Sequence, residues 1–137
     1  DREQIRLVAS GNGKLAIVNS YYYIKMFLDG NEIVKKNTNV HFPSDKKMGT
    51  HVNISGIGIT KKSKNLKNSK KFIEFLVSNE AQKIYSEKNY EYPVVENIIP
   101  NENQKKFRNF IADDISLSKL GKLNSKALIM SDKAGWR

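Results

Sequence analysis

The apolar run KLAIV, residues 14–18, is the feature that most constrains how this chain can fold. A short, uninterrupted apolar segment is typical of a β-strand that is covered on both faces, as in a parallel sheet. The preceding residues, REQIRLVA, have helical spacing and end at the glycine-rich residues 11–13, while Asn19 and Ser20 are suitable N-cap residues for a second helix. Helix, strand and helix in this order predict an α/β fold.

Two more strands are expected further along the chain. The segment HVNISGIGIT, residues 51–60, carries apolar residues on alternate positions, and their parity changes at Gly56. A strand that changes faces at a glycine is kinked or bulged, so this segment is predicted to pass between two packing environments. A shorter strand is predicted over residues 40–42.

Helices are predicted in the second half of the chain. Residues 68–89 have the apolar spacing of two consecutive helices that break near Ser78. Residues 90–103 are expected to be extended because two prolines exclude a helix there. The tail predicts short helices, of which the last lies near residues 124–134 and ends at Gly135.

The chain of 137 residues carries a net charge of +10 and contains no cysteine, which excludes disulfides and thiolate metal sites. A charge of this size raises the question of nucleic-acid binding. The densest basic run, KKSKNLKNSKK at residues 61–71, mixes lysine with asparagine and serine and lacks the arginines and aromatics that recognition favours. We therefore expect a solvated, lysine-rich face there.

Three consecutive tyrosines, Tyr21, Tyr22 and Tyr23, follow the apolar run. Ligands of doubly wound sheets bind beyond the carboxyl ends of strands, where Tyr21 and Tyr22 fall. Two phenols make a poor acid–base couple because their ordinary pKa is about 10, but their oxygens suit a strongly charged cation, and Fe(III) best. The alternative is packing, which is the commoner role of aromatic clusters. Tyr23, four residues before Phe27, is expected in the core.

Five stretches resemble the C-terminal part of the periplasmic ferric-iron-binding proteins of ABC importers: GKLAIVNSYYY, GTHVNISGIGI, KNSKKFIEFLVSNEAQ, NYEYPV and KAGW. The resemblance extends over nearly the whole chain in the same order, and the Asn-x-Tyr-Tyr element is its most specific part. In that family the tyrosine pair after the strand supplies two phenolates to Fe(III). The resemblance thus implies that Tyr21 and Tyr22 are metal ligands, while Tyr23 matches a position that accepts another aromatic.

The resemblance implies part of a two-lobed, type II periplasmic-binding-protein fold of the α/β class, truncated at its N-terminus. Residues 1–48 would be the remainder of the second lobe with the tyrosine pair, and residues 49–103 would cross the hinge and return to the first lobe. Residues 104–137 would be helices that pack back on the second lobe. Tyr90 and Tyr92 match a family motif near the hinge and are read as structural.

The function implied is that of a periplasmic substrate-binding protein, not an enzyme, which captures Fe(III) and delivers it to an ABC-transporter permease. A synergistic anion such as carbonate or phosphate would complete the metal site, and the full-length protein is expected to be a monomer that binds no nucleic acid. One alternative keeps the fold but binds a small organic or phosphorylated anion. A second alternative, a basic nucleic-acid-binding module, is supported only by the net charge.

Other candidate residues carry weaker signals. His41 and His51 each lack a second histidine or a carboxylate at metal-ligand spacing. Asp113 and Asp114 are expected to be a charge feature at a helix N-terminus. No Ser/His/Asp or Cys/His arrangement is present, so the residues themselves also predict no enzyme.

Overall fold

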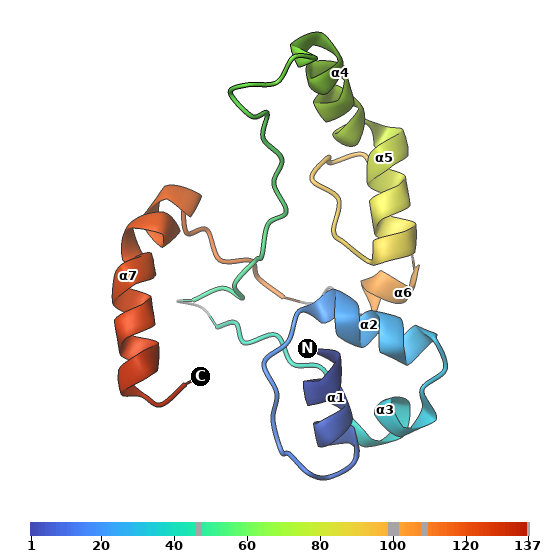
Figure 1. Cartoon of the computed structure of the whole chain (residues 1–137). Helices are drawn as coiled ribbons and strands as arrows, with labels where there is room; N and C mark the ends of the chain where they lie inside the picture. The colour runs from blue at the N-terminus through green and yellow to red at the C-terminus, as the bar shows by residue number, and fades with distance from the viewer. Residues whose placement is uncertain (46–47, 99–101, 108–109, 137) are drawn as a thin grey trace. The chain divides into compact units, whose positions relative to one another are not determined.

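The computed structural model describes residues 1–45, 48–98, 102–107 and 110–136. The chain forms two compact units, the first comprising Asp1–Phe42 and Asn53–Asn109, and the second Pro43–Val52 and Phe110–Arg137. The described residues are helices joined by extended segments (Figure 1).

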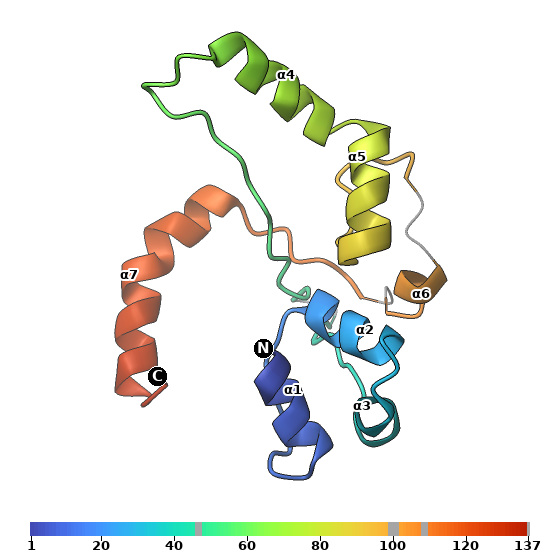
Figure 2. The ribbon, with the colours of Figure 1, turned by 45° about the vertical axis from the view of Figure 1, so that its right-hand side comes forward.

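The first unit holds most of the helices. Their bounds are α1 Arg2–Ala9, α2 Ser20–Leu28, α3 Glu32–Asn37, α4 Leu66–Leu76, α5 Asn79–Ile84, the π-helix η1 Tyr85–Asn89, and α6 Glu102–Lys105. Figures 1 and 2 both show α1, α2 and α3 side by side in one cluster, and α5 continuing the path of α4.

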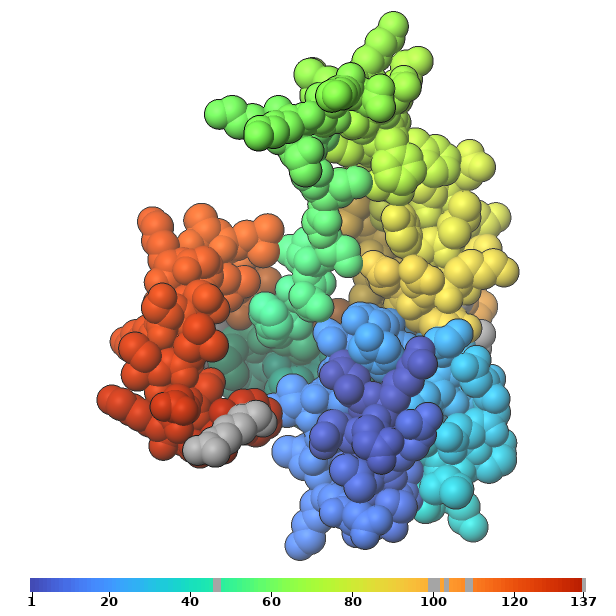
Figure 3. Space-filling view, viewed as in Figure 1, coloured from blue at the N-terminus to red at the C-terminus, as the bar shows by residue number. Residues whose placement is uncertain are grey.

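The core of this unit lies between α1, α2 and α3. Figure 3 shows the side chains of α1 in contact with those of the segment around α3. The buried core side chains come from all three helices and from the residues after α6: Ile5, Ala9, Tyr23, Ile24, Met26, Val34 and Phe107. Each helix therefore buries one apolar face against the other two.

The predicted helices before and after residues 14–18 are confirmed. α1 ends just before Gly11, whose φ of +81° suits glycine. α2 begins directly after Asn19 as expected, although the Asn19 side chain makes no capping hydrogen bond. α3 was not predicted; its N-cap, Asn31, accepts a hydrogen bond from the Val34 N–H at 3.2 Å.

The prediction of strands over residues 14–18, 40–42 and 51–60 is wrong for the described part of the chain. All three segments are extended, but none pairs into a sheet there. A strand exists only where a second backbone satisfies its N–H and C=O groups, and apolar patterning cannot supply that partner. Leu15 and Ile17 are consequently 86% and 76% exposed.

The two consecutive helices predicted after residue 67 are confirmed, with the break at Ser78. The Ser78 hydroxyl accepts a hydrogen bond from the Ala81 N–H at 3.3 Å and so caps α5. The helix then continues as η1, after which Tyr90 adopts a left-handed conformation with φ 59°.

Residues 90–103 were predicted to be extended. Residues 91–93 lie outside any helix as expected, residues 94–97 form bends and a turn, and α6 begins within the predicted segment at Glu102. Residues 99–101 lie outside the described residues.

The second unit contains the isolated parallel bridge between Thr50 and Ala112. The Thr50 N–H donates to the Ile111 carbonyl at 2.7 Å, and the Asp113 N–H donates to the Thr50 carbonyl at 2.8 Å. A Cβ atom on Gly49 would lie 2.4 Å from the Ala112 backbone, so this close approach requires glycine.

The last helix, α7 Leu117–Lys133, starts earlier than the predicted residue 124 and ends before Gly135, as expected. The Ser116 hydroxyl caps it by accepting the Lys119 N–H at 3.3 Å, a signal that the sequence reading overlooked. Across the part of the chain that the structure describes, no helix combines the length and apolarity needed to cross a membrane.

Candidate metal site

Tyr21 and Tyr22 lie in the first turn of α2, where the chain leaves the extended segment 14–18. Their ring centroids are 4.4 Å apart with an interplanar angle of 44°. Neighbouring side chains of a regular helix diverge by about 100°, so the two rings lean toward each other. The Tyr22 N–H bonds the Asn19 carbonyl at 3.2 Å, three residues back, which tightens this turn.

The neighbourhood of Tyr21 changes the acidity of its phenol. A hydrogen bond with the Tyr22 side chain raises the pKa of Tyr21, and burial and the charges of Tyr22 and Glu91 raise it further. Without a bound cation, Tyr21 is therefore a neutral phenol at neutral pH. On the other side, the Arg2 guanidinium lies 5.4 Å from the centroid of the Tyr22 ring.

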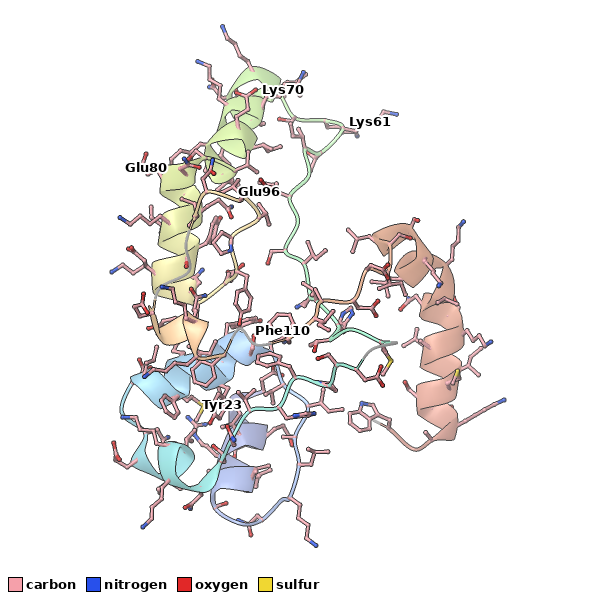
Figure 4. All side chains as sticks on the ribbon, turned by 180° about the vertical axis from the view of Figure 1, so that it is seen from behind. Tyr23, Lys61, Lys70, Glu80, Glu96 and Phe110 are labelled. Carbon is pink, nitrogen blue, oxygen red and sulfur yellow. The ribbon has the colours of Figure 1, made fainter. Side chains whose placement is uncertain are left out.

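Tyr23 has a different role from its two neighbours. Its side chain is 4% exposed, its hydroxyl donates to the Thr38 carbonyl at 3.2 Å, and its ring meets Phe107 edge-on at 5.8 Å. Figure 4 shows Tyr23 within the helical cluster. The prediction that Tyr23 belongs to the core is confirmed, which leaves Tyr21 and Tyr22 as the half-buried pair.

Asn19, just before the pair, links it to two distant segments. Its backbone N–H and its Nδ2 both donate to the Asp1 carboxylate at 2.9 Å. The Asn53 Nδ2 donates to the Asn19 Oδ1 at 3.2 Å. The segment predicted to cross between lobes thus contacts the start of the tyrosine-bearing helix.

Glu91 is the acidic residue whose charge acts on Tyr21. Its carboxylate accepts hydrogen bonds from the Ser55 hydroxyl at 3.4 Å and from the Asn89 Nδ2 at 3.3 Å. The sequence reading missed Glu91. Its position between two tyrosines in NYEYPV was the available signal, but nothing in the sequence placed that motif beside Tyr21.

The weaker candidates do not join this site. His41 and His51 are exposed and belong to different units. Asp113 and Asp114 lie just before Ser116, the N-cap of α7, and outside its first turn, which holds no acidic residue.

The tyrosine pair has few metal-binding side chains around it. Within the described ranges, no three His, Cys, Asp or Glu side chains group together as a metal site. Two phenol oxygens can bind a hard cation once they lose their protons, but Fe(III) needs more donors than this pair supplies.

A family model described as bacterial extracellular solute-binding protein matches residues 6–110. Iron uptake protein A1 of Synechocystis sp. is 38% identical over 140 residues, which cover all of this chain and 39% of that protein. The major ferric iron-binding protein of Neisseria meningitidis serogroup B is 27% identical over 84% of this chain and 35% of that protein. The chain thus spans about two-fifths of the length of these relatives.

Solved structures of ferric-binding proteins are also similar to this chain. The ferric binding protein from Campylobacter jejuni matches with a TM-score of 0.89 and 38% identity, over 100% of this chain and 44% of that one. Apo ferric ion-binding protein A from Pasteurella haemolytica matches with a TM-score of 0.91 and 39% identity, over 99% of this chain and 43% of that one.

Proposed function

The chain belongs to the family of bacterial extracellular solute-binding proteins, and on this basis we propose that it is part of a protein that captures Fe(III) outside the cytoplasmic membrane. The family consists of binding proteins, so the expectation of no enzymatic activity is confirmed. The expected fold class is also confirmed: the chain corresponds to part of the two-lobed α/β fold of the ferric-binding proteins.

The observation that carries the proposal is the contact between Tyr21 and Tyr22. Their rings lie 4.4 Å apart in the first turn of one helix, which supports binding of a single ion by both phenol oxygens. Phenolates are hard, anionic donors, which suit a small trivalent cation. The names of the relatives, which refer to iron uptake and ferric iron binding, support the same cargo.

Several finer assignments belong to this proposal. A synergistic anion such as carbonate or phosphate, together with ligands from the rest of a two-lobed protein, completes the metal site. The loaded protein delivers iron to an ABC-transporter permease from the periplasm, as a monomer. Residues 1–48 and 104–137 belong to the second lobe, and residues 49–103 cross the hinge.

The alternative of a small anionic cargo fits the site less well. The Glu91 carboxylate acts electrostatically on Tyr21, and a negative charge beside the pair repels an anion that binds without a cation. The Arg2 guanidinium lies over the Tyr22 ring, 5.4 Å from its centroid. A cation, with or without an accompanying anion, is the better match.

A titration of the full-length protein tests the proposal. Fe(III), supplied as its nitrilotriacetate complex, should bind at one site and produce a visible phenolate-to-iron charge-transfer band. Phosphate and small organic anions without iron should give no saturable heat in calorimetry. Saturable binding of an iron-free anion, with no colour on adding Fe(III), would establish the alternative cargo.

A further inference from the structure

We propose that Asp1 is a positioning residue of the candidate metal site, which acts through Asn19 and fixes the direction in which the Tyr21–Tyr22 pair leaves the first turn of α2. The inference rests on the proposed function and adds to it a residue outside the tyrosine motif. Asp1 lies 18 residues before Asn19 in sequence and in the same compact unit.

The Asp1 carboxylate holds Asn19 by two hydrogen bonds. The backbone N–H and the Nδ2 of Asn19 both donate to the same oxygen, Oδ2, at 2.9 Å. Hydrogen bonds to a carboxylate are shorter and stronger than bonds between neutral groups. Because one bond holds the backbone and the other the side chain, the contact restrains both the main chain and the rotamer of Asn19.

Two N-cap residues form this contact instead of capping their own helices. Asp1 precedes α1 and Asn19 precedes α2. Aspartate and asparagine are among the best capping residues, because their side chains can accept a backbone N–H of the first helical turn. Neither side chain makes such a bond here. Their local hydrogen bonds are replaced by a contact between distant segments, which indicates a role beyond the stability of either helix.

Asn53 restrains the remaining polar atom of the Asn19 side chain. The Asn53 Nδ2 donates to the Asn19 Oδ1 at 3.2 Å. An amide flip of Asn19 would place its oxygen against the Asp1 carboxylate, where two acceptors would face each other. The three residues therefore admit one orientation of the Asn19 side chain.

The main chain of Asn19 transmits this restraint to the tyrosines. Its carbonyl accepts the Tyr22 N–H at 3.2 Å, the bond that tightens the first turn of α2. The contact between the Tyr21 and Tyr22 rings, 4.4 Å between centroids, occurs in the same turn. A binding site requires its groups to be held within about 0.5 Å of the productive geometry. A small movement of Asn19 is therefore enough to misplace both phenols.

The same anchor places Arg2 beside the pair. Arg2 follows Asp1 directly, and its guanidinium lies 5.4 Å from the centroid of the Tyr22 ring. A guanidinium at this distance from an aromatic ring makes a cation–π contact, which restrains the ring. Loss of the Asp1 contact should therefore release the Tyr22 ring as well as the turn that carries it.

The test uses Asp1→Ala in the full-length protein, which removes both hydrogen bonds to Asn19. Fe(III) affinity, measured by competition with citrate, should fall roughly 10–100-fold, as for other outer-sphere partners of metal ligands. The charge-transfer band should shift and broaden because the phenolates then take several orientations. Asp1→Asn is the conservative variant: its side-chain oxygen can still accept both donors, so affinity and spectrum should return largely to wild-type values.

Glu3→Ala is the matched control. Glu3 is another exposed acid of α1, but its carboxylate pairs with Arg6 at 3.2 Å. Its removal should leave affinity and spectrum unchanged, which separates the hydrogen bonds of Asp1 from a general loss of negative charge. Asn53→Ala removes the third contact, a bond between neutral groups, and should lower Fe(III) affinity only several-fold.

The iron-free protein gives a readout that does not depend on the cargo. The NMR signals of the Tyr21 and Tyr22 rings, assigned with the Tyr→Phe variants, should be displaced by their mutual contact. Asp1→Ala should move these signals toward those of a free tyrosine and leave the signals of buried Tyr23 in place. Asp1→Asn should leave all three sets unchanged. Movement of the Tyr23 signals as well would mean a general loss of structure and would overturn the positioning role.

The other outcomes decide as follows. Wild-type affinity, spectrum and ring signals in Asp1→Ala would overturn the inference, and so would a loss of affinity with an unchanged band. If Asp1→Asn behaves like Asp1→Ala, the charge of Asp1 and not its hydrogen bonds is responsible, which also overturns it. If the wild-type protein binds no Fe(III), the proposed function fails, and the ring signals alone decide whether Asp1 orients the pair.

Discussion

The ring of Tyr22 lies 4.4 Å from the ring of Tyr21, although the two residues are adjacent in the first turn of one helix. This contact exists because the turn is irregular: the Tyr22 N–H bonds the carbonyl of Asn19, three residues back. The extended residues 14–18 directly precede that turn in the chain. The three consecutive tyrosines therefore form one pair of rings in contact, Tyr21 and Tyr22, and one buried neighbour, Tyr23.

Tyr23→Phe should affect stability and leave iron binding unchanged. The substitution removes the hydroxyl that donates to the Thr38 carbonyl at 3.2 Å and keeps the ring that packs on Phe107. The expected loss is about 0.5–1.5 kcal/mol in the free energy of unfolding, measured by denaturant titration of the full-length protein. A variant with native stability but a bleached charge-transfer band would show that Tyr23, not its neighbours, faces the metal.

Iron affinity should decrease as the medium is acidified. The hydrogen bond with Tyr22 raises the pKa of Tyr21, so this phenol is protonated before binding and must release a proton to become a ligand. Calorimetry in buffers of different ionisation enthalpy measures that release. Proton-neutral binding around pH 7 would contradict phenolate ligation.

The iron-free protein should lose stability at high pH. A tyrosine whose pKa is raised by folding contributes stability that is present below the ordinary pKa of about 10 and is lost as pH rises through the folded value. For Tyr21 the stability of iron-free protein should therefore fall in alkali, measured by thermal unfolding against pH. Tyr21→Phe should reduce this alkaline loss, and an identical pH profile in the variant would exclude Tyr21 as its source.

Residues 1–137 expressed alone should not be fully native. Leu15 and Ile17 on one face of the extended segment are 86% and 76% exposed, whereas Val18 on the other face packs against the core. An unpaired, apolar edge of this kind binds other chains or hydrophobic dyes. We expect dye binding and a broad thermal transition; a monomeric, cooperative transition with a native near-UV signal would contradict this.

The sequence predicted the local features of the fold well. α1, α2 and the break between α4 and α5 follow from caps, glycines and 3.6-residue periodicity, which act over a few residues. α3 was missed, although Asn31 is its N-cap and is a residue type that favours this position. The strands were overpredicted because pairing depends on backbone outside the segment itself.

The same distinction applies to the candidate site. Tyr21 and Tyr22 are adjacent in sequence, so their pairing could be proposed from the motif and the following helix. Glu91 and Ser55 could not, because their contact with each other spans 36 residues and depends on tertiary structure.

The charge-transfer spectrum of the full-length protein loaded with Fe(III) tests the tyrosine pair most directly. Tyr21→Phe and Tyr22→Phe each remove one anionic oxygen and keep the ring, so packing is preserved while coordination is lost. Each variant should shift or weaken the band and lower iron affinity, while Tyr23→Phe keeps the wild-type spectrum. Full colour and wild-type affinity in both Tyr21→Phe and Tyr22→Phe would show that the pair only packs and does not bind iron.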